Sequence, residues 1–588
     1  PLGGGFVLDP LGTHDVFIPE EASDEEKSLA QLANEFSSNE VLPHSAAIEA
    51  GNHEPVVKLF KKAGELGLLM AEVPTEYGGL GLGKVPTTFI SENVTHQGSY
   101  SVAFMCHTGI ATLPVMAFGT EAQKQKYLTK LATGEMIGAY SLTEPGAGSD
   151  ALAGRTKAVL APDGKHYLIN GEKIFVTNGG FADLFTLFAK IDGEHFTAFL
   201  VERNTPGLTI GREEKKMGIH GSSTVTLSLK DAKVPVENVL GEKGKGHRIA
   251  FNVLNVGRWK LGAASVGACK RLIEKSIPYI KQRQQFEKPI ADFELMRDKV
   301  ATCAVATYLS ESMVYRFAHT LDAVTAALDA SATDLAHQKQ EVLKEYAIEA
   351  SIAKVFCSEA LQKVADEAVQ MFGGYGFCED YEVERFYRDC RINRIFEGTN
   401  EINRLIIVNT ILKRTMKGEL PLLNRLQEIL GQLKTGFPEA AKGEALGGEV
   451  DAVERLKRLA VYLAGVGVQK YQADMENQQM LLSCVADVIM DVYALESGVM
   501  RARKLRQKFG DEKAKVVEAM CRVAVAERSV QLVASARQAL INVAEGKPEE
   551  FEKYGKALER IAPKLVTDTR RDRLAIAARI IEKEAFVL

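Results

Sequence analysis

The stretch YSLTEPGAGSD, from Tyr140 to Asp150, marks the point where the character of the chain changes. Before it, over residues 23–137, apolar residues recur three and four apart, as in EEKSLAQLANEF, a pattern typical of helices. Ser23 with Glu26 forms a capping-box pattern at the start of this region. After it, over residues 138–245, short runs such as LFTLFAKI and TVTLSLK alternate with Gly, Asn and Asp turns. The stretch therefore joins a helical domain to a β domain, which we expect to be a barrel or a sandwich.

Two further helical regions are predicted after the β domain. Helical periodicity returns over residues 246–415, and a last helical region occupies residues 416–588. A Gly/Pro/Ala-rich passage, residues 435–449, interrupts the last region and is predicted to be a loop or disordered linker. The predicted fold class is α+β and mainly helical: an N-terminal helical domain, a central β domain, a second helical bundle domain and an extra C-terminal helical domain.

Bulk composition excludes several classes of protein. With 588 residues the chain is too long for one hydrophobic core, so several domains are expected. The formal net charge is −5 and no basic tail is present, which argues against nucleic-acid binding. The sequence contains no run of about 18 uninterrupted apolar residues, so no membrane span is predicted. The 8 cysteines are scattered without metal-ligand spacing, which predicts no metal site and indicates thiols in a reducing compartment.

The first motif with possible chemistry is the stretch from Tyr140 to Asp150. Gly146 and Gly148 would let backbone N–H groups approach a ligand closely, and Thr143 and Ser149 add hydroxyl donors. Such a loop suits a phosphate or the edge of a polar heterocycle, although an isolated loop of this composition is more often a simple turn. It is neither a Walker loop nor a Rossmann fingerprint, because the residues around it do not fit either pattern.

Two other motifs are candidates for a functional site. In GEKIFVTNGG, residues 171–180, strand geometry places Phe175 and Thr177 on one face, where a ring and a hydroxyl donor suit a flat ring system. An ordinary hairpin is the alternative interpretation. In IFEGTN, Glu397 lies between apolar Phe396 and Gly398, so it is a candidate general base whose pKa burial would raise. A glutamate on a solvated turn is the alternative.

Together and in this order, the motifs resemble the acyl-CoA dehydrogenases. The resemblance covers about residues 30–415 and is carried by TEPGAGSD, KIFVTNGG, FLVERNTPGLTIGREEKKMGIHGSST, RQQFEKPI, GGYGF and IFEGTNEI. The C-terminal extension, with EEKKMGI and LNVGR, is similar to the very-long-chain subgroup. The resemblance implies FAD-dependent oxidation of a long- or very-long-chain fatty acyl-CoA to trans-2-enoyl-CoA, the first step of fatty acid β-oxidation, with electrons passed to electron-transferring flavoprotein.

The resemblance also implies roles residue by residue. Glu397 matches the catalytic base. The positions that match FAD contacts are Tyr140, Leu142, Thr143, Gly148, Ser149, Phe175, Val176, Thr177, Arg283, Phe286, Gln370, Gly373, Gly374, Thr399, Asn400 and Glu401. The positions that match substrate contacts are Ser149, Asn255, Gly257, Arg258 and Gly398. Arg283, Phe286 and the segment 370–374 match residues that reach the FAD of a neighbouring subunit. Departures from the family pattern at Glu287, Glu294 and Glu401 concern the adenine end of the cofactor.

Gly257 matches the position where some members of the family place their catalytic glutamate. Because this chain has glycine there, position 257 offers no second candidate for the base beside Glu397. We also expect the missing side chain to let an acyl chain run deeper, which favours a long substrate. Tight helix packing at Gly257 is the alternative.

The resemblance further implies at least a homodimer, because FAD contacts cross between subunits. The stretch 455–471 has a basic start and an apolar body, so it could make a peripheral membrane contact, although a structural core is the alternative. The expected location is the mitochondrial matrix or inner membrane in a eukaryote and the cytoplasm in a bacterium. Two alternative functions are an acyl-CoA oxidase, reoxidised by oxygen, and a family member with an added assembly role in respiratory complexes.

Overall fold

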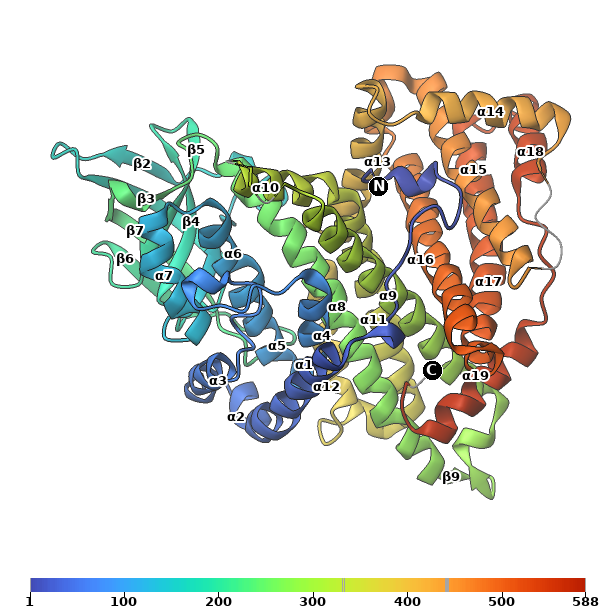
Figure 1. Ribbon diagram of the computed structural model, residues 1–588, viewed down its shortest axis with the longest axis horizontal. Coiled ribbons are helices and arrows are strands. Elements are labelled where there is room, and N and C mark those ends of the chain that lie inside the picture. Colours follow the sequence, from blue (N-terminus) through green and yellow to red (C-terminus); the bar gives the residue numbers. More distant parts are fainter. Residues whose placement is uncertain (1, 330, 333, 439–443, 587–588) are drawn as a thin grey trace.

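The computed structural model describes residues 2–329, 331–332, 334–438 and 444–586 (Figure 1). Residues 439–443 of the predicted linker lie outside the described residues. The sheet lies at one end of the molecule, long helices occupy the centre, and the C-terminal helices lie at the other end (Figure 1). The order of helical, β, helical and C-terminal helical regions is as the sequence predicts.

The N-terminal region is helical, and its first helix begins at the predicted cap. The Ser23 hydroxyl accepts the Glu26 backbone N–H, and the Glu26 carboxylate accepts the Ser23 N–H, which completes the capping box. The helices are α1 (Asp24–Glu35), α2 (Ser45–Glu49), α3 (Glu54–Glu65), α4 (Lys84–Asn93), α5 (Gly98–Met105), α6 (Thr112–Phe118) and α7 (Glu121–Thr133). Residues 98–118 are long and apolar enough to span a bilayer, but they pack as core, with Tyr100 and Phe104 buried.

The β region forms one mixed sheet of eight strands among the described residues. The strands are β1 (Gly138–Ser141), β2 (Lys157–Leu160), β3 (His166–Thr177), β4 (Leu184–Ile191), β5 (His195–Glu202), β6 (Leu208–Glu213), β7 (Thr224–Pro235) and β8 (Val239–Leu240). Their order is β6-β7-β3-β2-β4-β5-β8, with β1 paired to β4. β3 pairs with β2 and β7 rather than with β4, so the turn at Asn178-Gly179 does not close a hairpin.

Strands β4 and β5 are buried on both faces, which explains their nearly continuous apolar sequences. Phe185 and Leu187 belong to the core inside the β region. Leu184 and Phe188 lie on the opposite face and belong to the large helical core, which includes Ile249 and Val253 of α8. This packing joins the sheet firmly to the start of α8.

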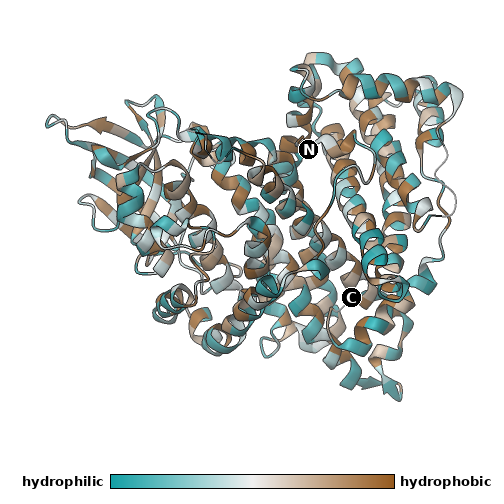
Figure 2. Ribbon diagram, in the orientation of Figure 1, coloured by the Kyte–Doolittle hydropathy of each residue, from teal (hydrophilic) through white to brown (hydrophobic). Residues whose placement is uncertain are grey.

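The central bundle contains α8, the longest helix of the described structure. It consists of α8 (Gly246–Gln282), α9 (Glu294–Ala326), α10 (Leu335–Glu345), α11 (Ala347–Phe372), α12 (Val383–Cys390) and α13 (Asn400–Met416). A small hairpin, β9 (Gln284–Gln285) with β10 (Lys288–Pro289), follows α8. These helices carry both hydrophobic and hydrophilic residues along their length, as expected of helices that bury one side (Figure 2).

The C-terminal region adds six helices to the described structure. They are α14 (Leu422–Thr435), α15 (Gly447–Tyr471), α16 (Gln479–Phe509), α17 (Asp511–Val543), α18 (Pro548–Ile561) and α19 (Thr569–Lys583). Leu456, Leu459 and Leu463 of α15 are fully buried in the same core as the bundle. The apolar body of the stretch 455–471 is therefore structural core, and its side chains are not available for a membrane.

Residues 2–22, which we call the N-terminal strap, lie across the junction between the bundle and the C-terminal helices (Figure 1). The Gly4 N–H donates to the Glu349 carboxylate of α11 at 2.6 Å, and the Phe6 ring packs on Tyr493 of α16 with centroids 4.7 Å apart. A Cβ atom on Gly3 would lie 2.0 Å from the Glu345 carbonyl oxygen, so only glycine fits there. The strap is thus an integral part of the core.

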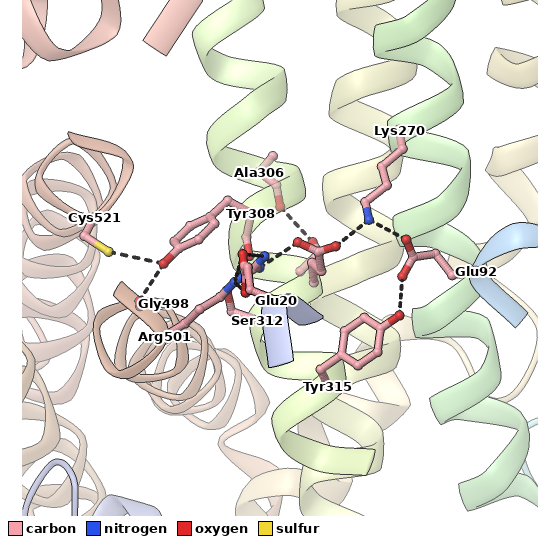
Figure 3. A network of polar contacts seen from close by, with 12 residues as sticks. Glu20, Glu92, Lys270, Ala306, Tyr308, Ser312, Tyr315, Gly498, Arg501 and Cys521 are labelled. Atoms are coloured by element: carbon pink, nitrogen blue, oxygen red, sulfur yellow. Dashed lines mark hydrogen bonds and ion pairs between the residues drawn. The ribbon is translucent and has the colours of Figure 1, made fainter. Parts of the chain in front are cut away.

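A buried chain of charges links the strap, the C-terminal helices and the bundle (Figure 3). Arg501 of α16 donates to Glu20 of the strap and to Glu311 of α9, each at 2.6 Å. Lys270 of α8 bonds both Glu311 and Glu92 of α4. Each of these charges has an opposite partner, so the charged network connects the strap with α4, α8, α9 and α16.

Candidate active site

A cavity of about 950 Å³, counting its open mouth, lies between α5 and α8. One wall comes from α8, where Lys260 is charged and the other lining residues are small or apolar, namely Gly257, Leu261, Ala264 and Ala268. The facing wall comes from α5 and its neighbours, namely Gly98, Ser101, Val102, Met105 and Cys106. Thr177 of β3, Phe396 and Glu397 also line the cavity. Helical spacing explains the α8 wall, because residues four and seven apart share one face.

Glu397 lies at the break between the 3-10 turn Arg391–Arg394 and α13. Its backbone is left-handed, with φ +59°, and Gly398 follows with φ +79°. A Cβ atom on Gly257 would lie 2.8 Å from Glu397 Oε2, which shows how closely the carboxylate approaches α8. This oxygen is buried and has no hydrogen-bond partner among the described residues. The carboxylate is therefore free to act on a molecule in the cavity.

Backbone carbonyls of the Glu397 turn are bound by three side chains. Arg258 Nε donates to the Glu397 carbonyl at 3.1 Å, and Asn255 Oδ1 accepts from Arg258 at 2.9 Å. Asn403 Nδ2 and Lys354 Nζ each donate to the Gly398 carbonyl at 2.8 Å. Asn255, Arg258 and Gly398, predicted from the sequence as substrate contacts, meet at this turn, whereas Lys354 and Asn403 were not singled out from the sequence. A lysine within the apolar helix ASIAKVFCSEA was the signal that could have pointed to Lys354.

Electrostatics at Glu397 favour a role as base near neutral pH. Burial raises the pKa of Glu397 to about 7, while the positive charges of Arg258 and Lys354 oppose this rise. Burial also lowers the pKa of Lys354 to about 7. A carboxyl with a pKa in this range can accept a proton from a weak carbon acid without being permanently protonated.

Thr177 lines this cavity, and Phe175 lies two residues before it on β3. The β3–β7 register shifts between Lys173 and Val176, and within this bulge Phe175 takes φ +56°. The bulge leaves the Phe175 ring 62% exposed while Val176 is buried. An exposed aromatic ring beside a hydroxyl that lines the cavity is the arrangement expected for contact with a flat cofactor.

The loop that contains Leu142, Thr143, Gly148 and Ser149 is fixed by hydrogen bonds from β3. Lys173 Nζ donates to the Leu142 carbonyl at 3.2 Å, and the Ile174 N–H donates to the Thr143 carbonyl at 2.9 Å. A Cβ atom on Gly146 or Gly148 would meet nothing within 4 Å, so both glycines face open space. Tyr140, which precedes the loop, is half-buried and packs edge-on against Phe188. The loop therefore presents exposed backbone on a fixed base.

A second group of predicted cofactor residues lies apart from Glu397 within this chain. Arg283 and Phe286 lie on the β9–β10 hairpin, which Figure 1 shows at the end of the bundle away from the sheet. The Arg283 guanidinium lies 5.6 Å from the Tyr375 ring, next to the exposed Gln370, Gly373 and Gly374. Phe286 is 87% exposed. This group is not brought to the cavity of its own chain.

The predicted residues at the start of α13 differ in exposure. Thr399 accepts the Ile402 N–H through its side chain and so caps the helix. Asn400 is buried, and its side chain bonds Lys354, Ser358 and Glu359. Glu401 is exposed. Asn400 thus supports the Glu397 turn internally, whereas Thr399 and Glu401 lie nearer the surface.

Comparison with known proteins places these features in a family. The sequence matches the family model "Acyl-CoA dehydrogenase, N-terminal domain" over residues 23–135 and the "middle domain" over 139–232. Two models described as "Acyl-CoA dehydrogenase, C-terminal domain" match residues 244–412 and 455–551.

Full-length relatives agree with these matches. A "Probable acyl-CoA dehydrogenase" of Bacillus subtilis (strain 168) is 46% identical over 100% of this chain and 98% of its own. The mitochondrial very long-chain specific acyl-CoA dehydrogenase of Rattus norvegicus is 34% identical over 83% of this chain and 80% of its own. The crystal structure of an acyl-CoA dehydrogenase complexed with FAD from Bacillus anthracis is 45% identical, covers 100% of both chains and superposes with a TM-score of 0.97.

The residues around the cavity fit the cofactor of that relative. An exposed aromatic ring, a hydroxyl in the cavity wall and open glycine backbone provide a stacking surface and polar contacts for a dinucleotide with a flat ring. The chain belongs to the acyl-CoA dehydrogenase family and is an FAD-dependent oxidoreductase.

Proposed function

We propose that the enzyme oxidises long- or very-long-chain fatty acyl-CoA to trans-2-enoyl-CoA with Glu397 as the catalytic base. The single observation that carries this proposal is the unpartnered Glu397 Oε2 facing the cavity between α5 and α8. A thioester whose α carbon lies at this oxygen would have its acyl tail directed along the cavity.

The length of the α8 wall supports a long substrate. Gly257 and Ala268, which both line the cavity, are separated by eleven helical residues, or roughly 16 Å along the helix axis. The wall is apolar along Leu261, Ala264 and Ala268. Each buried methylene of a substrate would contribute about 0.8 kcal/mol, so a long chain would bind far better than a short one.

Proton removal is the step that the protein side chains perform. Glu397 takes the α proton, and its backbone N–H would donate to the thioester carbonyl as negative charge develops there. FAD held at this site would supply the acceptor for the β hydrogen, which leaves as hydride. Arg258 supports the turn that places Glu397, and an acyl chain that fills the cavity would keep water from the α carbon.

For the cofactor, we propose that two chains contribute to each site. Tyr140, Leu142, Thr143, Gly148, Ser149, Phe175, Val176, Thr177, Thr399 and Glu401 would contact FAD within one chain. Arg283, Phe286, Gln370, Gly373 and Gly374 would contact the FAD of a second chain, which accounts for their exposure away from the cavity. A homodimer is then the smallest complete unit.

Electron-transferring flavoprotein is the proposed acceptor of the electrons, and the bacterial relatives support a cytoplasmic location. We also propose that the chain divides into the regions 23–137, 138–245, 246–415 and 416–588. Residues 2–22 pack against the last two of these regions.

The test is anaerobic mixing of the FAD-loaded enzyme with acyl-CoAs from short to very long chains. Bleaching of the flavin absorbance should be fastest with the long chains. Reoxidation in air with stoichiometric hydrogen peroxide would instead support the alternative acyl-CoA oxidase. Failure of every chain length to bleach the flavin would contradict the proposal and favour the assembly role.

A further inference from the structure

Lys354 of α11 differs from the other buried lysines of the described structure. Lys173, Lys260, Lys354 and Lys457 are each at most 2% exposed. Lys173 has a carboxylate at 2.7 Å, Lys260 at 2.7 Å and Lys457 at 3.2 Å. Lys354 has no carboxylate within 4.0 Å among the described residues. Burial of an unpaired ammonium is unfavourable, so ion pairing does not explain this lysine.

Lys354 instead binds the turn that carries Glu397. Its Nζ donates to the Gly398 carbonyl at 2.8 Å and to Asn400 Oδ1 at 2.6 Å. The two contacted residues lie one and three positions after Glu397 in the sequence. No other side chain in the described structure bridges the turn to the first residue of α13 in this way.

The turn needs such support because its backbone is strained. Glu397 is a non-glycine residue in the left-handed region, which costs about 1–2 kcal/mol. Arg258 binds the Glu397 carbonyl from α8, and Lys354 binds the next carbonyl from α11. The two cations therefore hold two successive carbonyls from two different helices, which fixes the backbone immediately after the Glu397 side chain.

We propose that Lys354 is a positioning residue, which fixes the Glu397–Gly398 turn and so aims the catalytic carboxylate at the substrate. This inference rests on the proposed role of Glu397 as base. Lys354 does not touch the substrate in this scheme. It acts through the carbonyl of Gly398 and through its charge.

The charge gives the proposal a signature that a packing role lacks. Burial raises the pKa of Glu397, and Arg258 and Lys354 oppose the rise. The titratable groups that interact with the Glu397 carboxylate are Arg258, Lys354, Cys106 and Tyr140. Burial lowers the pKa of Lys354 to about 7, so Lys354 is charged over the lower part of the pH range in which Glu397 titrates. Removal of this charge should raise the pKa of Glu397 further, and the enzyme should need a higher pH to reach its maximal rate.

The experiment measures the rate of flavin reduction against pH in the FAD-loaded enzyme. Lys354→Met removes the donor and the charge, whereas Lys354→Gln keeps a donor but not the charge. Lys457→Met is the matched control, because Lys457 is equally buried but lies in α15, away from the cavity. Glu397→Gln reports on the proposed function itself. Flavin content and unfolding temperature are recorded for each variant.

We expect Lys354→Met to lower the maximal rate of flavin reduction by about tenfold or more. The rising limb of its pH–rate profile should also move to higher pH. The substrate concentration at half-saturation should change little, since Lys354 does not contact the acyl chain. Lys354→Gln should share the shift of the limb but lose less rate, because it can still donate to Gly398. Lys457→Met should keep the wild-type profile.

A Lys354→Met enzyme with a wild-type rate and limb would overturn the inference, as would a change equal to that of Lys457→Met. If Lys354→Met does not fold, Lys354→Gln decides, and a wild-type limb in that variant would overturn the inference. If Glu397→Gln reduces flavin at the wild-type rate, the proposed function fails and this inference with it. An inactive Glu397→Gln beside normal Lys354 variants would leave the proposed function intact and refute this inference alone.

Discussion

A Cβ atom on Gly257 would lie 2.8 Å from Oε2 of Glu397 and 2.9 Å from Cγ2 of Ile110. The missing side chain therefore makes room first for the carboxylate of Glu397, the proposed base. This differs from the expectation that glycine at 257 chiefly opens the path of the acyl chain. It also changes what a substitution there should do.

We predict that Gly257→Ala slows flavin reduction for all acyl chain lengths to a similar extent. The added methyl group must displace the Glu397 carboxylate, and a shift of about 1 Å in a reacting group can reduce a rate by about 100-fold. The measurement is the reduction rate across a chain-length series. Gly262→Ala is the control, because Gly262 lies on the same helix as Gly257. A Cβ atom on Gly262 would lie 3.3 Å or more from its nearest neighbours, Val314 and Ala353. A shift in chain-length preference at an unchanged best rate would contradict the prediction.

Chain length should instead be controlled further along α8. Ala264 and Ala268 are half-buried and line the cavity. Ala264→Leu should lower kcat/KM for long acyl-CoAs and spare short ones, and Ala268→Leu should affect only longer chains, because it lies roughly 6 Å further from Glu397. Ala306→Leu, a half-buried alanine of α9 outside the cavity lining, tests whether overpacking itself is harmful. Identical length profiles for the two cavity variants would refute this assignment.

Glu397→Gln should still bind FAD and acyl-CoA but should lose flavin reduction by several orders of magnitude, since it cannot accept the proton. Its stability should also depend on pH differently. The folded pKa of Glu397, about 7, is above its unfolded value, so its stabilising contribution is full below about pH 4.5 and is lost as pH rises through 7. The variant should therefore gain stability relative to wild type between pH 5 and 8, by at most roughly 3 kcal/mol. If the unfolding temperatures of the variant and the wild type differ by the same amount at pH 5 and at pH 8, Glu397 is not a buried group that titrates in this range.

Arg501→Met should destabilise the protein by about 3–5 kcal/mol, because it leaves the Glu311 carboxylate with only Lys270 as a buried partner (Figure 3). Arg570→Ala, which breaks an exposed pair with Glu294, should cost at most about 1 kcal/mol. Denaturant unfolding of the FAD-loaded protein measures both. Similar losses in the free energy of unfolding of the two variants would show that the buried ion pairs of Arg501 contribute no more stability than an exposed pair.

Arg283→Ala should weaken retention of FAD although Arg283 lies away from the cavity of its own chain. The reason is that its guanidinium would serve the cofactor of a second chain. Flavin content after gel filtration, together with the mass of the particle in solution, is the measurement. Added FAD should raise the unfolding temperature of the variant by mass action. A monomer with full flavin content would contradict the shared site.

Much of the fold and site could be predicted from local sequence. The capping box at Ser23, the change to strands near Gly138 and the helix break at Glu397 each depend on neighbouring residues, and each is present. Contacts between distant segments could not be read in this way. Lys354 reaches the Glu397 turn from 44 residues away, and the strap meets α11 and α16 from more than 340. No periodicity or motif encodes such pairings, because they depend on how whole helices pack.

The distance between Glu20 and Arg501 along the chain has a consequence for synthesis at the ribosome. Arg501 follows Glu20 by 481 residues, so at roughly 5–20 residues per second it emerges about half a minute to a minute and a half later. Through that interval the nascent strap has no α15 or α16 on which to dock, and Phe6 and Val7 remain uncovered. The strap therefore leaves the ribosome well before the helices on which it docks, and it can reach its native place only after they have formed.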